Sequence, residues 1–504
     1  MGARSRFRQL LAEAPSDAQA VDFEDSWHTW GLFQAIARGL DEALAKHGLG
    51  EGARIGLVLE NRPEHVGLII ALLASDRCIV TLSPLQPPER LAADIGRSEV
   101  PVVVATPEAL AREGVADAIT AVSVALRLDP DGTITEVGGA VTTQNKVNPG
   151  VVIEMLTSGT TGPPKRVQLR ERQFDKALET SVPAPKPDVL FRSGTTLVTT
   201  PLVHIGGFWG AVSPLYAGRN IALMHRFQLQ PWLHLVEKHR PRAAGMVPAV
   251  IRTVLDAGVP VEALSSLQVV TCGTTFCPPE LADEFTDKYG IPVLSVYGAT
   301  EFAGAVAGWT LPMYQKWWSS KHGSTGQAFA GVELRTTDDD GNVLGVDEVG
   351  RLELRTQQVQ GGPDGWVRTS DLARIDADGF LFIIGRADDA IVRGGFKVQP
   401  DVVKKALERH PSVREAAVAP LPDNRLGNVP VAGVEVRPGA PRPTEAELIA
   451  LCREQLTPYE APVHVIVVDE LPRTPSSKVS RVDLLELVTK HIAEKASAAQ
   501  QSKA

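Results

Sequence analysis

A run of small hydroxylated residues and glycines leads to a lysine in "LTSGTTGPPKRV", residues 156–167. Gly159 and Gly162 allow a phosphate group to approach the backbone N–H donors, and the neighbouring hydroxyls add further donors. Lys165 supplies a positive charge, so the segment is typical of a phosphate-binding loop. It differs from a Walker A loop because the prolines before Lys165 are incompatible with direct entry into a helix. Arg166 follows directly and needs a separate explanation.

Helical and strand-like patterns alternate on both sides of this loop. Apolar residues recur at helical spacing over 33–44, and "PEHVGLIIALLA" (63–74) continues that pattern. Short apolar strands are predicted at 53–60, 78–82, 100–105, 196–202, 220–224, 242–247, 267–273 and 292–298. This alternation predicts an α/β fold of layered, largely parallel sheets, whose ligand sites lie beyond the carboxyl ends of the strands.

The pattern changes in the last third of the chain. Asp-Gly turns in "TTDDDGNVL" (336–344) and "RIDADGFLFII" (374–384) predict β-hairpins. The amphipathic segment 400–413 and the strand-like segments 415–421 and 431–436 predict a small α+β domain. We therefore predict a large N-terminal domain with a β-rich subdomain (1–385), a hinge (386–389), a small mobile C-terminal domain (390–490) and a flexible tail (491–504).

Composition excludes several classes of protein. The 504 residues carry 51 basic and 60 acidic side chains, a net charge of −9, without a dense basic block, so nucleic acid is not an expected partner. Four scattered cysteines indicate reduced structural thiols rather than a disulfide framework or a zinc site. The longest apolar run, residues 66–74, is shorter than the roughly 20 residues that span a bilayer. We expect a cytoplasmic enzyme, because the N-terminus also lacks an apolar signal-peptide core.

The phosphate-binding segment resembles the signature of the adenylate-forming superfamily, which includes acyl-CoA synthetases, nonribosomal peptide synthetase adenylation domains and firefly luciferases. Similar motifs of that superfamily follow in family order: "PLVHIGGFWG" (201–210), "VYGATE" (296–301), "RTSDLARID" (368–376), "GRADD" (385–389), "GGFKVQP" (394–400) and "LPRTPSSK" (471–478). The resemblance implies ATP-dependent formation of an acyl-adenylate, rotation of the small domain, and displacement of AMP by the thiol of coenzyme A.

By position in these motifs, the resemblance assigns catalytic roles to four side chains. His204 is expected near the acyl carboxylate, and Thr300 is expected to hydrogen-bond the α-phosphate. Glu301 is the expected ligand of Mg²⁺. Lys478 is the lysine that enters the site only during adenylation.

The resemblance also implies the residues that bind ATP and coenzyme A. The triphosphate loop comprises Thr157, Ser158, Gly159, Thr160, Thr161, Gly162 and Lys165. The adenosine part of ATP or AMP is expected at Gly273, Thr274, Tyr297, Gly298, Asp371 and Arg386, where Tyr297 stacks on adenine and Asp371 grips the ribose. Asp388 is the hinge residue, Gly394 and Gly395 line the pantetheine channel, and Lys397 meets a CoA phosphate.

The sequence departs from the family pattern near the adenylation residues. Arg166 and Ser477 stand where the family has glycine, "CGTTF" (272–276) replaces a Gly-Ala-Pro type stretch, and Ser370 replaces glycine before Asp371. A guanidinium about 4 Å from a phosphate gains about 4 kcal/mol at an effective dielectric constant near 20, so charge alone does not forbid ATP. Either Arg166 fills the pyrophosphate space, and the enzyme uses an acyl-adenylate made by an upstream enzyme, or Arg166 points into solvent and the full reaction proceeds.

The predicted function is that of an AMP-forming acyl-CoA synthetase acting on a bulky hydrophobic acid. In the segment "HIGGFWGAV", Gly206, Gly207, Gly210 and Ala211 leave room for the acid, and Phe208 and Trp209 supply apolar walls. Loading of a carrier protein and silent binding of an acyl-adenylate are the alternatives. The sequence leaves open whether the chain is a monomer or a homodimer.

Overall fold

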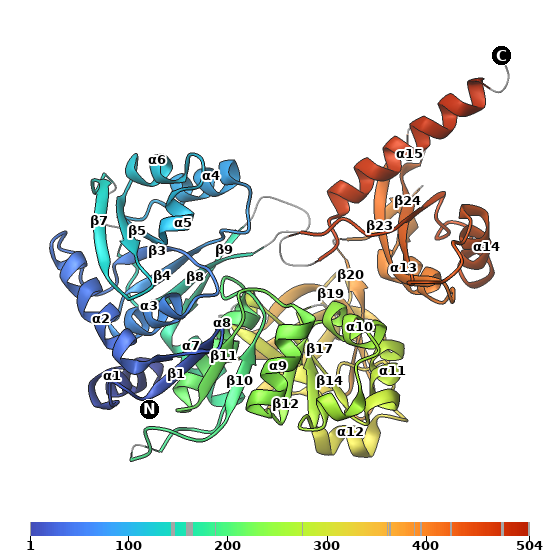
Figure 1. Cartoon of the computed structure of the whole chain (residues 1–504). Coiled ribbons are helices and arrows are strands. Elements are labelled where there is room, and N and C mark those ends of the chain that lie inside the picture. The colour runs from blue at the N-terminus through green and yellow to red at the C-terminus, as the bar shows by residue number, and fades with distance from the viewer. Residues whose placement is uncertain are drawn as a thin grey trace. The chain divides into compact units, whose positions relative to one another are not determined.

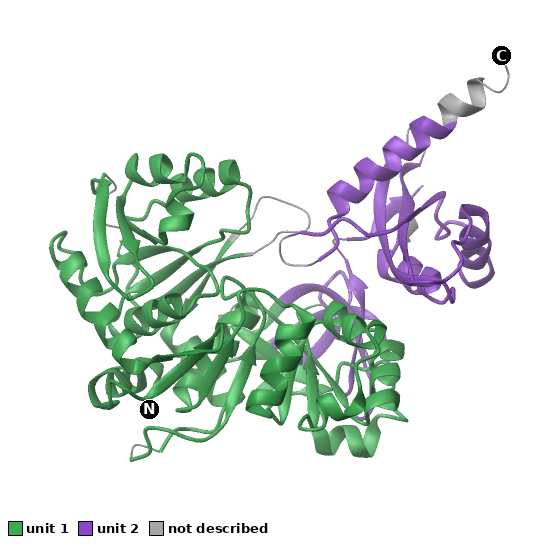
Figure 2. Cartoon of the chain, viewed as in Figure 1, with its two compact units in different colours: residues 1–333, 355–367 green, residues 334–354, 368–504 purple. Residues whose placement is uncertain are grey.

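The structure is a computed structural model of the chain (Figure 1). It describes residues 2–142, 147–157, 165–186, 188–274, 276–359, 361, 364–387, 389–393, 396–423, 426–474 and 478–501. The chain divides into two compact units (Figure 2). Unit 1 comprises Met1–Glu333 and Arg355–Val367, and unit 2 comprises Leu334–Leu354 and Arg368–Ala504.

The largest sheet of unit 1 has seven strands in the order β7-β6-β5-β3-β4-β8-β9 (Figure 1). Its strands are β3 (Arg54–Val58), β4 (Cys78–Leu82), β5 (Val102–Ala105), β6 (Val124–Leu128), β7 (Ile134–Gly139), β8 (Val151–Thr157) and β9 (Lys165–Arg170). The central strands are parallel, whereas β7 and β9 pair antiparallel at the edges. The β8–β9 hairpin therefore carries the predicted triphosphate loop.

Helices cover both faces of this sheet, which explains why β3, β4 and β5 are apolar at almost every position. On one face pack α1 (Ala3–Glu13), α2 (Trp30–Ala45), α3 (Pro63–Ala74) and α7 (Glu171–Ser181). On the other face pack α4 (Pro88–Ser98), α5 (Pro107–Leu110) and α6 (Val115–Thr120).

Unit 1 contains two further sheets. The first has the order β10-β11-β1-β2, with β1 (Gln19–Phe23), β2 (Ser26–Thr29), β10 (Thr195–Val198) and β11 (Asn220–Leu223), and α8 (Ile205–Tyr216) and α9 (Leu229–His239) follow its strands. The second has the order β12-β13-β14-β15-β16, with β12 (Ala243–Met246), β13 (Val269–Cys272), β14 (Val293–Ala299), β15 (Gly304–Gly308) and β16 (Gln327–Ala328). Its helical segments are α10 (Pro248–Asp256), η1 (Val261–Leu264), α11 (Pro279–Tyr289), η2 (Thr300–Phe302) and α12 (Leu311–Trp317).

Unit 2 holds most of a four-stranded sheet and all of a mixed sheet. The four-stranded sheet runs β17 (Val332–Thr337), β18 (Gly350–Thr356), β19 (Val367–Ile375) and β20 (Leu381–Arg386). The mixed sheet has the order β22-β21-β24-β23, with β25 beside β24; its strands are β21 (Ile391–Arg393), β22 (Phe396–Val398), β23 (Val413–Asp423), β24 (Gly427–Val436) and β25 (His464–Val468). The helices are α13 (Pro400–Glu408), α14 (Glu445–Gln455) and α15 (Arg481–Gln501).

The α/β fold class predicted from the sequence is confirmed, and α3 and β4 have the predicted bounds. The hinge and the mobility of the small domain stay predictions, and so does the flexible tail, whose residues up to Gln501 belong to α15. Within the described ranges, no helix combines the length and apolar character needed to cross a bilayer.

All four cysteines are free thiols in buried positions. A hydrogen bond with Cys277 and burial raise the pKa of Cys272 well above its usual range, and burial raises the pKa of Cys452 to about 11. Cys272 and Cys452 are therefore poor nucleophiles, because a buried thiol with a raised pKa stays protonated. This agrees with the structural role predicted from the sequence.

Candidate active site

Two neighbouring parallel strands of unit 1 bring predicted site residues to one edge of a sheet. Cys272, the last residue of β13, lies opposite Ser295 of β14, so the loops that follow both strands leave the sheet at the same edge. Gly273 and Thr274 belong to the first loop. Thr274 has a φ of +73°, an uncommon conformation for a residue with a side chain.

The end of β14, with Tyr297 and Gly298, and the loop after it, with Thr300 and Glu301 on η2, hold the remaining unit 1 residues of this set. Tyr297 and Thr300 are half-buried, whereas Glu301 is exposed on η2. Gly298 is required by packing, because a Cβ there would lie 2.2 Å from the carbonyl oxygen of Gly304. A half-buried aromatic ring and an exposed carboxylate at the end of one strand suit a nucleotide and its metal ion.

Helix α8 lies against both loops. His204 is its N-cap residue. A Cβ added to Gly206 would lie 3.5 Å from the Thr274 hydroxyl oxygen, and Trp209 Nε1 donates a hydrogen bond to the Ala303 carbonyl at 2.8 Å. The structure therefore brings together the segments that carry His204, Thr274 and Glu301.

Two neighbouring aromatic residues on α8, Phe208 and Trp209, differ in how far they are buried. Phe208 is fully buried and meets Phe174 edge-on, with 6.0 Å between ring centroids. Trp209 is half-buried and packs on the same Phe174 at 4.6 Å. A Cβ on Gly207 would lie 2.2 Å from the Pro201 carbonyl oxygen, so this glycine serves close packing rather than making room for the acid. Of these two neighbouring rings, Trp209 is thus the one that stays partly exposed.

Asn61, which the sequence analysis did not assign to the site, holds the chain that leads to His204. Its side chain donates to the carbonyls of Thr200 (3.1 Å) and Met224 (2.9 Å) and accepts from the Leu202 N–H (2.7 Å). Asn61 is 4% exposed. A polar residue directly after a buried strand was the available signal, since such positions lie at the ligand edge of parallel sheets.

We expect Asn61→Ala to lower the free energy of unfolding by about 1–3 kcal/mol, because buried backbone groups lose their partners. The catalytic efficiency toward the acid should fall as well, since the segment before His204 loses its support. Chemical denaturation and steady-state kinetics measure the two effects. Asn148→Ala is the matched control, because its amide lies at the periphery of another network, 3.3 Å from Glu154. Equal kinetic losses in both variants would contradict the role of Asn61.

Unit 2 places two predicted ribose-binding residues side by side. Asp371 of β19 lies directly opposite Arg386 of β20. Arg386 Nη2 donates to the Ser370 hydroxyl at 2.6 Å, and the Thr369 hydroxyl accepts from the Asp371 N–H at 3.0 Å. The four-stranded sheet thus places the two residues opposite each other, and the Ser370 hydroxyl holds the Arg386 guanidinium.

Lys478 is an exposed residue of unit 2. Its carbonyl accepts hydrogen bonds from the N–H (2.7 Å) and hydroxyl (3.1 Å) of Thr474. Three residues further on, Arg481 Nη1 pairs at 2.9 Å with Asp389, the last residue of the predicted hinge.

Several predicted residues lie outside the described residues. These are Ser158, Gly159, Thr160, Thr161, Gly162, Asp388, Gly394, Gly395 and Ser477. Thr157 and Lys165 pair across β8 and β9, and Lys397 belongs to β22, but their side chains are likewise outside the description.

Comparison with known proteins matches residues 7–362 to the AMP-binding enzyme family and residues 403–478 to the AMP-binding enzyme C-terminal domain. The chain belongs to the AMP-binding enzyme family. Relatives include a sulfoacetate–CoA ligase of Cupriavidus necator, 29% identical over 92% of this chain and 93% of the relative. A 4-coumarate–CoA ligase 3 of Oryza sativa subsp. japonica is also 29% identical, over 91% of this chain and 86% of the relative.

Solved structures support the same fold. The o-succinylbenzoate CoA synthetase of Bacillus subtilis, determined with its acyl-adenylate intermediate, superposes with a TM-score of 0.77 at 24% identity and covers 95% of this chain and 97% of that one. The predicted placement in the acyl-CoA synthetase branch of the adenylate-forming superfamily is confirmed, as is the class of AMP-forming acid–thiol ligase.

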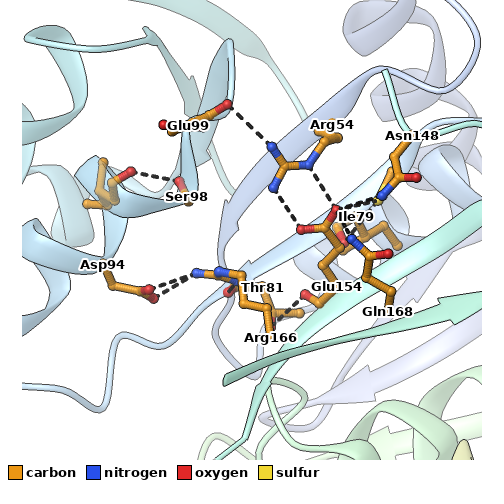
Figure 3. A network of polar contacts seen from close by, with 12 residues as sticks. Arg54, Ile79, Thr81, Asp94, Ser98, Glu99, Asn148, Glu154, Arg166 and Gln168 are labelled. Carbon is orange, nitrogen blue, oxygen red and sulfur yellow. Dashed lines mark hydrogen bonds and ion pairs between the residues drawn. The ribbon is translucent and has the colours of Figure 1, made fainter. Parts of the chain in front are cut away.

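Arg166, one of the four departures from the family pattern, is held by a buried carboxylate (Figure 3). Its Nη2 lies 2.9 Å from both carboxylate oxygens of Asp94 on α4, and its Nη1 donates to the Thr81 carbonyl at 2.8 Å. The Asp94 side chain is 3% exposed and that of Arg166 is 17% exposed. The expectation that Arg166 points into solvent is therefore wrong, and its charge is already paired within unit 1.

A second ion pair braces the same hairpin (Figure 3). Arg54 of β3 holds both oxygens of Glu154 on β8, at 2.9 and 2.7 Å, and Gln168 of β9 lies 3.5 Å from the same carboxylate. The strands that lead into and out of the predicted triphosphate loop are thereby tied to the centre of the sheet and to α4.

Ser370, another departure from the family pattern, also has a structural role. Its hydroxyl accepts the Arg386 hydrogen bond described above, and its carbonyl accepts from the Ala387 N–H at 2.8 Å. Ser370 therefore gives Arg386 a hydrogen-bond acceptor that a glycine at this position would lack.

Proposed function

We propose that the chain is an acyl-CoA synthetase that carries out both half-reactions on a bulky hydrophobic acid. It would form the acyl-adenylate from acid and ATP, releasing pyrophosphate, and then transfer the acyl group to coenzyme A, releasing AMP. The observation that carries the proposal is that the segments holding His204, Thr274, Thr300 and Glu301 lie against one another in unit 1.

The contacts of the Arg166 side chain favour the complete reaction over use of a preformed acyl-adenylate. The alternative, in which the enzyme cannot adenylate, requires the Arg166 side chain to fill the pyrophosphate space. Its guanidinium instead makes its hydrogen bonds to Asp94 and Thr81, on α4 and β4. A guanidinium held by the buried Asp94 and the Thr81 carbonyl supports the complete reaction, because the alternative requires this side chain to fill the pyrophosphate space.

A hydrophobic acid fits the residues of α8 and its neighbours. The helix Ile205–Tyr216 and the segment 300–308 contain no lysine or arginine that could meet a second anionic group. Trp209 provides an apolar face, held by its hydrogen bond to Ala303. The named relatives act on acids as different as sulfoacetate and 4-coumarate, so the acid is inferred from this chain's own residues.

The residues would divide the chemistry as follows. Lys165, Thr300 and Lys478 would stabilise the charge that spreads over the phosphates as the carboxylate attacks. Glu301 would hold Mg²⁺; one exposed carboxylate fits an ion that takes its remaining ligands from phosphate oxygens and water. The ion would offset phosphate charge. Asp371 and Arg386 would orient the ribose.

A panel of acids tests the proposal. Purified protein is incubated with ATP, Mg²⁺ and 4-coumarate, benzoate, hexanoate, malonate or sulfoacetate, and pyrophosphate release and CoA thioester are measured. We expect turnover with the hydrophobic monoacids. Preference for malonate or sulfoacetate would contradict the acid class, and thioester only from synthetic acyl-adenylates would contradict the complete reaction. Transfer to a pantetheinylated carrier protein but not to coenzyme A would support the loader alternative, and tight adenylate binding without turnover the silent binder.

Trp209→Ala should shift the preference among hydrophobic acids toward bulkier ones, because it removes the aromatic wall beside Ala303. We expect the ratio of kcat/KM for a bulky acid to that for 4-coumarate to rise by about 10-fold or more, the value of one or two methylene contacts. Phe208→Leu is the control: it alters the neighbouring aromatic residue, which is fully buried. An unchanged ratio in Trp209→Ala would exclude this residue from the acyl site.

A further inference from the structure

Lys478 stands on a short antiparallel hairpin of unit 2. Arg473 and Val479 form an isolated β-bridge. The Thr474 N–H donates to the Lys478 carbonyl at 2.7 Å, and the Ser480 N–H donates to the Pro472 carbonyl at 2.7 Å. The position of the lysine backbone therefore depends on the segment 471–474.

Two carboxylates of the mixed sheet hold that segment. Arg473 Nη2 lies 2.6 Å from Glu415 Oε2 of β23 and 3.3 Å from Glu435 Oε2 of β24. Glu435 also accepts from the Leu471 N–H at 3.1 Å and is 1% exposed. One buried carboxylate thus binds both the backbone and the guanidinium at the start of the hairpin.

Arg473 lies between two carboxylates that repel each other. Glu415 and Glu435 are direct cross-strand partners, and like charges directly opposite each other destabilise a sheet. Arg473 contacts both carboxylates, whereas Arg414 reaches Glu435, through Oε1 at 2.6 Å, and Lys404 lies 3.9 Å from Glu415. Arg473, a residue of the hairpin of Lys478, therefore bridges the two carboxylates and offsets part of the repulsion between them.

We propose that Arg473 is a positioning residue for adenylation: bound between Glu415 and Glu435, it sets the place of the hairpin that presents Lys478. The inference rests on the proposed function, in which Lys478 serves the first half-reaction and not the second. Loss of Arg473 should therefore impair adenylation selectively. A merely structural ion pair would affect both half-reactions alike.

The experiment compares Arg473→Gln with Arg414→Gln. Each removes one arginine from the same Glu435, but only Arg473 belongs to the hairpin. For each variant we measure pyrophosphate release with ATP and the best acid of the panel, and thioester formation from the matching synthetic acyl-adenylate and coenzyme A. We expect Arg473→Gln to lower the first rate by about 10- to 100-fold, since a misplacement near 1 Å can cost about 100-fold. The second rate should stay near that of the parent protein.

Amide hydrogen exchange gives a readout that needs no acid. In Arg473→Gln the Thr474 and Ser480 N–H groups should exchange faster, because the hairpin they close has lost its anchor; Arg414→Gln should leave them protected. Arg473→Lys, which keeps the charge, should restore part of the adenylation rate.

Each outcome decides between named alternatives. Parallel losses of both half-reactions, or equal effects of Arg473→Gln and Arg414→Gln, would overturn the positioning role. Unchanged exchange at Thr474 and Ser480 would do the same. If the parent protein adenylates no acid but the exchange difference is present, the proposed function fails while the anchoring of the hairpin stands.

Discussion

Lys478→Ala should abolish most of the adenylation activity while leaving transfer from a preformed acyl-adenylate intact. The lysine is exposed on its hairpin, and its charge would meet phosphate oxygens only while the adenylate forms. Removing one preorganised donor to a developing charge costs about 100- to 1000-fold in rate. Pyrophosphate release and thioester formation, measured separately, give the two rates.

The control for Lys478→Ala is Lys490→Ala. Lys490 has 76% of its side chain exposed on α15 and lies 3.9 Å from Glu494, so its loss should change neither rate. Equal activity of Lys478→Ala and the parent protein in adenylation would remove Lys478 from the catalytic set and would weaken the whole motif assignment.

Arg166→Gly should destabilise unit 1 rather than improve adenylation, although it restores the residue typical of the family. The substitution leaves Asp94, whose side chain is 3% exposed, without its cation. Removing one partner of a buried ion pair costs about 3–5 kcal/mol in free energy of unfolding, and we expect about 3 kcal/mol because the arginine retains some contact with solvent. Chemical denaturation measures this loss.

The double variant Arg166→Met with Asp94→Leu separates charge burial from catalysis. Replacing a buried ion pair by apolar residues is often neutral, so the double variant should recover most of the stability that Arg166→Gly loses. The adenylation rate of the double variant shows whether the Arg166–Asp94 ion pair also supports the predicted triphosphate loop. A rise in pyrophosphate release in Arg166→Gly, with stability unchanged, is the result that would return Arg166 to the role of an obstacle.

The sequence predicted what depends on short stretches of chain. Periodicity located α3, β4 and most of the parallel strands, because strands buried on both faces are continuously apolar. The Asp-Gly turn before Phe380 correctly predicted the hairpin between β19 and β20. Motif order also gave the family, since phosphate binding and ribose binding require particular residue types at local spacing.

Contacts between distant segments could not be predicted in the same way. Asp94 lies 72 positions before Arg166, and Asn61 lies 141 positions before Leu202. Nothing in the local sequence of Arg166 distinguishes a side chain that reaches the triphosphate from one that turns to α4. The sequence predicts that Gly207 leaves room for the acid, whereas the fold brings the Pro201 carbonyl against it.

The sequence by itself therefore determined the class of enzyme and the residue types available for adenylation. Only the tertiary structure decided how those residues are supported: Arg166 by Asp94, the His204 segment by Asn61, and the Lys478 hairpin by Glu415 and Glu435 through Arg473. The physical reason is that a buried charge or backbone group must find its partner wherever the fold brings one, and sheet packing joins residues far apart in the chain.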